Sequence, residues 1–239
     1  MKVLSIGNSF SQDAQRYLHE VALSNGVELE TVNLYIGGCS LEMHNHNMQG
    51  DLPAYELERN GASTSEKISI RAALEMECWD VVTVQQVSNL SGDYSTYLPY
   101  ITDLVAYVKT FCPQAKIYIH ETWPYEHESE LLHNVGYTTS LEMYTALKSC
   151  YERAATAISA DGAIHSGTAM MEAIRRGVKI HRDTFHASLG LGRYLLALVW
   201  YKTLTGQNVS KDSFDSFDEP VSETERKLAI EIANAVAVY

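Results

Sequence analysis

The strongest constraint on the fold is an alternation along the chain between short apolar runs and segments of helical character. Helices are predicted at residues 14–22, 68–76, 101–108, 147–158, 189–204 and 222–236, from apolar spacings of three and four or, at Ser222 and Glu225, from a capping box. Five strands are predicted between them, at residues 3–6, 29–35, 81–84, 117–119 and, more weakly, 163–164. This order predicts a three-layer α/β/α fold around a five-stranded parallel sheet.

The pattern continues without an internal repeat, a low-complexity tract or a linker, so residues 1–239 are predicted to form a single domain. A formal net charge of −12 with no basic run argues against nucleic acid and anionic membranes as partners. No apolar stretch approaches 18 residues, and no signal peptide is visible. The chain as written is therefore expected to be cytoplasmic, or secreted or periplasmic if a leader was removed.

Unusual polar residues and glycines follow the predicted strands. They are Ser9 after the first strand, Gly37 and Gly38 after the second, residues 86–89 after the third, residues 120–123 after the fourth and His165 after the fifth. The carboxyl ends of strands form the ligand crevice of open α/β sheets. Residues far apart in sequence are therefore expected to meet at this edge.

Ser9 is the first candidate for chemistry, because it lies between a strand and a predicted helix. Helix N-termini present unpaired N–H groups. Ser9 or Ser11 could simply cap the helix, and Ser11 suits that role better. Asp183 and His186 are three residues apart, directly before another predicted helix. A serine, an imidazole and a carboxylate are the components of a Ser-His-Asp hydrolase, although an isolated Asp-x-x-His is more often a solvated loop pair.

Four motifs together resemble the SGNH (GDSL-type) serine hydrolases. Residues 6–11, Ile-Gly-Asn-Ser-Phe-Ser, resemble the first block, with Asn8 where an aspartate is usual. Gly38 resembles the glycine of the second block, and Val-Ser-Asn at 87–89 resembles the third block, which is usually Gly-x-Asn. Asp-Thr-Phe-His at 183–186 resembles the last block. The resemblance spans residues 3 to 186, and the blocks appear in the family order.

The resemblance implies a flavodoxin-like SGNH fold and a serine esterase. In that reading Ser9 is the nucleophile, His186 the base and Asp183 the residue that orients the base. The backbone N–H groups of Ser9 and Gly38 would bind the oxyanion, together with the side-chain amide of Asn89 or of Gln86. Asn89 is preferred, but the third block departs most from the family, because Val87 replaces its glycine.

The interpretation of the substrate class depends on the composition of the loops. Polar loops after the second strand favour a polar alcohol, and O-deacetylation of a carbohydrate is the leading interpretation. His44, Trp123 and Tyr125 are the candidate substrate-binding residues. A thioesterase or lysophospholipase is the alternative within the same fold, and a non-catalytic glycan-binding module is the alternative outside it.

Several histidines and acidic residues are candidate metal ligands. They are His44, His46, His120, Glu121, His127, Glu128 and His133. His44 and His46 fall in a predicted polar loop, and none of the set has the spacing of a known helical zinc motif. We therefore expect no metal and no cofactor.

Overall fold

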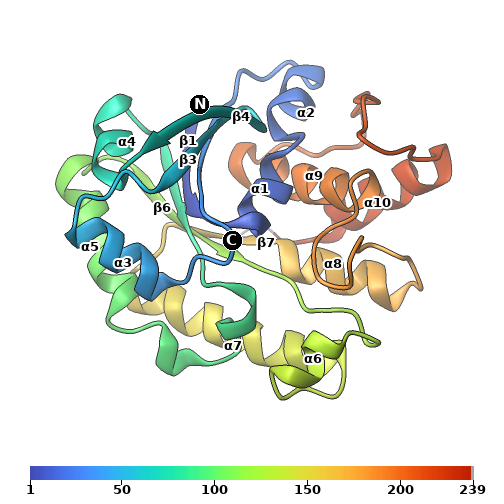
Figure 1. Ribbon diagram of the computed structural model, residues 1–239. Coiled ribbons are helices and arrows are strands. Elements are labelled where there is room, and N and C mark those ends of the chain that lie inside the picture. Colours follow the sequence, from blue (N-terminus) through green and yellow to red (C-terminus); the bar gives the residue numbers. More distant parts are fainter. Residues whose placement is uncertain (238–239) are drawn as a thin grey trace.

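The described residues, 1–237, form a seven-stranded sheet with the order β4-β3-β2-β1-β5-β6-β7 in the computed structural model (Figure 1). Five of these strands are parallel to one another and coincide with the predicted strands. They are β1 (Lys2–Gly7), β2 (Glu30–Tyr35), β5 (Val81–Val84), β6 (Lys116–Glu121) and β7 (Gly162–His165). The α/β/α prediction is confirmed.

The predicted strand number is wrong, because a hairpin extends the sheet beyond β2. Its strands β3 (Tyr55–Arg59) and β4 (Ala62–Ile68) pair antiparallel, and β3 pairs antiparallel with β2. β4 is exposed along almost all of its length, so it carries no apolar signal. Asn60 and Gly61 turn the hairpin with φ values of 51° and 76°, the positive values that an Asn-Gly turn provides.

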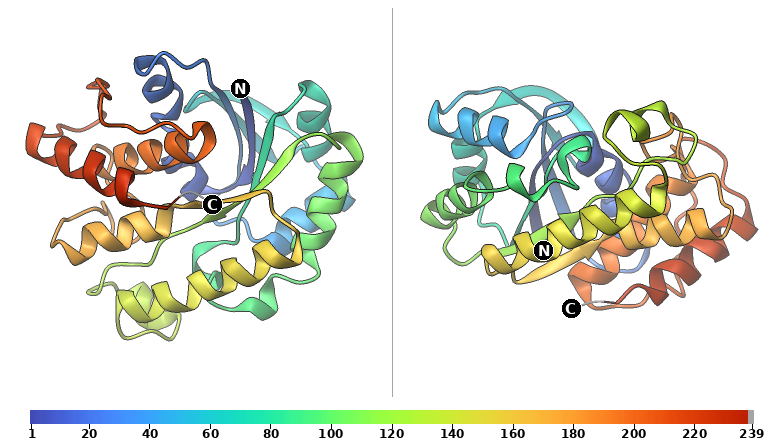
Figure 2. Two further views of the ribbon diagram at one scale, coloured as in Figure 1. Left: turned by 180° about the vertical axis from the view of Figure 1, so that it is seen from behind. Right: turned by 90° about the horizontal axis from the view of Figure 1, so that it is seen from below.

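Helices cover both faces of the sheet (Figure 2). One layer contains α1 (Ser9–Gln15), α2 (Leu18–Ser24), α8 (Ser166–Arg175), α9 (Leu191–Thr205) and α10 (Glu223–Ala235). The other contains α3 (Leu41–Gln49), α4 (Ile70–Met76), α5 (Tyr100–Phe111) and α7 (Ser140–Ala157). Shorter helices complete the chain: η1 (Ser88–Leu90), η2 (Tyr94–Thr96) and α6 (Glu130–Asn134).

Helix α9 is the centre of its layer. It packs against α1, α2, α8 and α10 and also contacts β7. Most of its side chains are buried, which accounts for its nearly continuous apolar sequence. Burial on all sides places apolar residues around a helix rather than along one stripe. Within residues 1–237, no helix combines the length and the apolar character that crossing a membrane requires.

Candidate active site

The turn after β1 presents Ser9 as the first residue of α1. Asn8 is the N-cap, since its side chain accepts a hydrogen bond from the Phe10 N–H at 3.0 Å. Ser11 completes a capping box by accepting from the Asn8 N–H at 3.0 Å. The expectation that Ser11 is the cap is therefore wrong. A Cβ atom on Gly7 would lie 2.1 Å from Ser11 Oγ, so only glycine fits before this turn.

Ser9, His186 and Asp183 lie in hydrogen-bond contact. His186 Nε2 is 2.9 Å from Ser9 Oγ, and His186 Nδ1 is 2.7 Å from Asp183 Oδ2. Asp183 Oδ1 accepts from the backbone N–H of His186 at 2.8 Å, which fixes the carboxylate beside its own histidine. An imidazole in this position can take a proton from the serine hydroxyl while the carboxylate stabilises the resulting charge.

The electrostatics of the pair favour an ionised Asp183. Partial burial acts to raise the pKa of Asp183, but the hydrogen bonds and charge of His186 outweigh it and lower the pKa. Arg182 Nε lies 3.9 Å from the same carboxylate. The side chain of Asp183 is 44% exposed and that of His186 is 17% exposed, so solvent reaches the pair from the carboxylate side.

The loop that carries Asp183 and His186 is tied to the segment after β6. The Glu126 N–H donates to the Thr184 carbonyl at 2.7 Å, where Thr184 has a φ of 71°. The Trp123 indole N–H donates to the Phe185 carbonyl at 2.8 Å, and its ring stacks on Phe10 at 4.1 Å. Because Phe10 follows Ser9, Trp123 links the serine turn to the histidine loop.

An ion network around the buried Asp13, which the sequence did not suggest, makes a second link between these two segments. Asp13 of α1 is fully buried and binds Arg182 Nη1 at 2.9 Å and Arg193 Nε at 2.9 Å. Arg193 also binds Asp218 at 2.8 Å. Only the position of Asp13 on the buried face of α1 could have pointed to such a partner.

The residues proposed to bind an oxyanion differ in their exposure to solvent and in the hydrogen bonds that they already make. Gly38 is exposed and has a φ of 66°, a value that favours glycine. Asn89 is exposed in η1. Gln86 is fully buried: its Oε1 accepts from the Leu41 and Val87 N–H groups at 3.0 and 2.9 Å, and its Nε2 donates to the Thr96 carbonyl at 2.9 Å. Gln86 therefore has a structural role, which favours Asn89 as the side-chain donor.

The three candidate substrate-binding residues are buried, with exposed fractions of 0% for His44 and Trp123 and 3% for Tyr125. His44 lies in helix α3, not in a loop as expected, and contacts the Tyr55 hydroxyl at 2.9 Å. Its burial lowers the pKa of His44 to about 3. The Tyr125 hydroxyl contacts that of Ser88 at 2.9 Å. This placement does not support direct substrate contact by any of the three.

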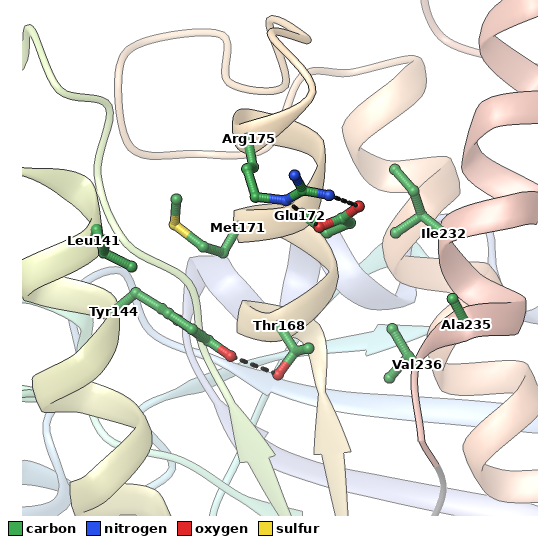
Figure 3. A pocket seen from close by; sticks show the side chains of 9 residues that line it. All are labelled: Leu141, Tyr144, Thr168, Met171, Glu172, Arg175, Ile232, Ala235 and Val236. Atoms are coloured by element: carbon green, nitrogen blue, oxygen red, sulfur yellow. Dashed lines mark hydrogen bonds and ion pairs between the residues drawn. The ribbon is translucent and has the colours of Figure 1, made fainter.

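An apolar groove of about 440 Å³ lies between α7, α8 and α10 (Figure 3). The Tyr144 and Thr168 hydroxyls meet there at 2.9 Å, and Glu172 pairs with Arg175 at 2.8 Å. Neither Ser9 nor His186 lines this groove. Ser9, which follows β1, and His186 therefore lie outside this groove.

Comparison with known families matches residues 2–236 to a domain of unknown function, DUF4886. The chain belongs to this family. A solved DUF4886 family protein from Bacteroides uniformis is 34% identical, with a TM-score of 0.91 over 98% of this chain and 93% of that one. A comparison with curated proteins gives no match.

More distant solved structures identify the fold. A putative SGNH hydrolase from Slackia heliotrinireducens is 23% identical, with a TM-score of 0.61 over 85% of this chain and 98% of that one. A putative GDSL-like lipase from Parabacteroides merdae is 13% identical, with a TM-score of 0.57 over 86% and 95%. The DUF4886 chain thus has the SGNH/GDSL-type fold that its motifs predict.

Proposed function

We propose that this DUF4886 protein is a serine esterase in which Ser9, His186 and Asp183 form the catalytic triad. The observation that carries the proposal is the continuous contact from Ser9 Oγ to His186 Nε2 at 2.9 Å and from His186 Nδ1 to Asp183 Oδ2 at 2.7 Å. Ser9 lies 174 positions before Asp183, whereas Asp183 and His186 are three residues apart. The fold shared with SGNH hydrolases supports the same reading.

The proposed reaction is acyl transfer through an acyl-enzyme. His186 Nε2 takes the proton of Ser9 as Oγ attacks the ester carbonyl, and the imidazolium then gives that proton to the leaving alcohol. Water repeats the sequence on the acyl-enzyme and releases the acid. The N–H groups of Ser9 and Gly38 and the amide of Asn89 are the proposed donors to the oxyanion, since preorganised donors stabilise the charge that develops there.

The proposed substrate is a carbohydrate O-acetyl ester. β2 and β5 flank β1 in the sheet, and the segments after them expose Gly37, Gly38 and Asn89. Such a surface suits a small acyl group and a hydrophilic alcohol better than a long lipid chain. A wide apolar groove next to Ser9 would favour the thioesterase or lysophospholipase alternative, and the apolar groove in Figure 3 is not lined by Ser9.

The test is a panel of acetylated sugars and p-nitrophenyl esters of increasing acyl length, assayed with the wild type and with Ser9→Ala. The proposal predicts turnover of acetyl esters that falls with chain length and disappears in Ser9→Ala. Faster turnover of long acyl chains would favour the lysophospholipase alternative. Sugar binding without turnover in either protein would favour the glycan-binding module.

A further inference from the structure

A line of five buried polar side chains runs beneath the Ser9 turn, and no step of the proposed reaction uses it. Its members have exposed fractions of 1% or less and come from five separate segments. They are Trp200 in α9, Ser166 at the start of α8, His120 in β6, Gln85 after β5 and Asn8 after β1.

Each member lies within hydrogen-bond distance of the next. Trp200 Nε1 is 3.2 Å from Ser166 Oγ, which is 3.0 Å from His120 Nε2. His120 Nδ1 is 2.5 Å from Gln85 Oε1, and Gln85 Nε2 is 2.8 Å from Asn8 Oδ1. Asn8 Nδ2 is 3.0 Å from the carbonyl oxygen of Cys39, where the line ends.

The Cys39 end of this line sets the direction of its hydrogen bonds. The Cys39 carbonyl can only accept, so Asn8 Nδ2 donates to it and Asn8 Oδ1 accepts from Gln85 Nε2. Gln85 Oε1 then accepts from His120, which carries a proton on Nδ1. Burial lowers the pKa of His120 to about 3, so the ring is neutral and its Nε2 accepts from Ser166, whose hydroxyl oxygen accepts from the Trp200 N–H.

Asn8 is the member that reaches the proposed oxyanion site. Its Oδ1 accepts from the Phe10 N–H as well as from Gln85, and its Nδ2 donates to the Cys39 carbonyl. Phe10 follows Ser9 and Cys39 follows Gly38, so one side-chain amide joins the backbone next to both proposed N–H donors. An aspartate here would place a carboxylate oxygen against the Cys39 carbonyl. This explains an asparagine where the SGNH pattern usually has aspartate.

We propose that Asn8, oriented by Gln85, His120, Ser166 and Trp200, is a positioning residue that holds the N–H groups of Ser9 and Gly38 in line for one oxyanion. The inference rests on the proposed esterase function. It assigns no contact with substrate to Asn8, so its loss is expected to change kcat rather than KM.

The first test uses Asn8→Asp and Ser166→Ala, assayed with p-nitrophenyl acetate and corrected for the folded fraction. We expect kcat to fall by about 10-fold or more in Asn8→Asp and by about 3-fold or more in Ser166→Ala, with KM within about 2-fold of the wild type. Thr203→Val is the control, because it removes a buried α9 hydroxyl that binds only the Val199 carbonyl, at 2.8 Å. Its kcat should equal that of the wild type.

A folded Asn8→Asp or Ser166→Ala that keeps the wild-type kcat, or that changes only KM, would overturn the proposal. If these variants do not fold, nitrogen-15 NMR of His120 in the wild type decides instead. The proposal requires a proton on Nδ1, none on Nε2 and no titration between pH 5 and pH 8, and the opposite tautomer or a titrating ring would refute it. A wild type that turns over no ester refutes the proposed function, and the tautomer measurement separates that result from a failure of the hydrogen-bonded line.

Discussion

Replacing Asp183 with asparagine should disable the site without unfolding it. Asp183 Oδ1 accepts from the N–H groups of His186 at 2.8 Å and Phe185 at 3.4 Å, and an asparagine carbonyl oxygen can keep both contacts. The amide nitrogen then takes the place of Oδ2, which is 2.7 Å from His186 Nδ1. An N–H at that position donates to Nδ1 and leaves the histidine proton on Nε2, where the ring cannot accept from Ser9.

Two contributions determine how far the rate falls: the lost charge of Asp183 and the changed tautomer of His186. Opposite unit charges at about 4 Å interact by about 1 kcal/mol in water and about 4 kcal/mol near a protein surface. The side chain of Asp183 is 44% exposed, so a value between these limits applies. A loss of about 2 kcal/mol corresponds to a rate decrease of about 30-fold. The wrong histidine tautomer lowers kcat further. The same substitution in a protease triad lowers kcat by roughly 10⁴-fold, and we expect a decrease of about 10³-fold here.

The assay is steady-state hydrolysis of p-nitrophenyl acetate, with kcat and KM determined separately and folding checked by thermal melting. Asp161→Asn is the matched control, because its carboxylate also accepts a backbone N–H, from Ile117 at 2.8 Å, but at the start of β6. The control should retain the wild-type kcat. A loss of less than about 30-fold in folded Asp183→Asn would refute the assigned role of the carboxylate.

Three further predictions concern Asn89, Gln86 and the response to acid. Asn89→Ala should lower kcat by roughly 10²–10³-fold without changing the melting temperature, because the side chain is exposed; an unchanged kcat would remove it from the site. Gln86→Ala should lower the free energy of unfolding in urea by about 2 kcal/mol or more, because two buried N–H groups lose their acceptor; unchanged stability would contradict its structural role. Burial lowers the pKa of His44 and His120 to about 3 and of His181 to about 4, so the unfolded chain binds more protons below pH 6.5. Urea titrations should show stability falling between pH 6.5 and pH 4, by about 1.4 kcal/mol per pH unit for each histidine at most, and equal stability at both ends would contradict this account.

The parallel part of the sheet could be predicted because its strands are apolar and buried on both faces. β5, for example, is buried at all four of its positions. The β3-β4 hairpin escaped prediction because β4 presents Ser, Thr, Glu and Lys side chains to solvent. Its one local signal was the Asn-Gly pair at 60 and 61, which lies in a stretch rich in other turn residues.

The contact between Ser9, Asp183 and His186 was predictable, because these residues follow the SGNH pattern. The positions of the candidate substrate-binding residues were not predictable from their aromatic or imidazole side chains. His44, Trp123 and Tyr125 use those groups in buried contacts. The hydrogen-bonded line from Trp200 to Asn8 joins residues 34 to 77 positions apart at each of its links, and no sequence spacing encodes such contacts. They depend on the packing of α8 and α9 against the sheet.

The central claim is that Ser9 is an activated nucleophile. The most direct measurement is labelling of the folded protein with a fluorophosphonate, followed by peptide mass spectrometry to locate the adduct. The account predicts one covalent adduct, on Ser9, that is absent in Ser9→Ala and forms much more slowly in Asp183→Asn. A folded wild type that takes up no label, or that is labelled at another residue with Ser9 unmodified, would contradict it.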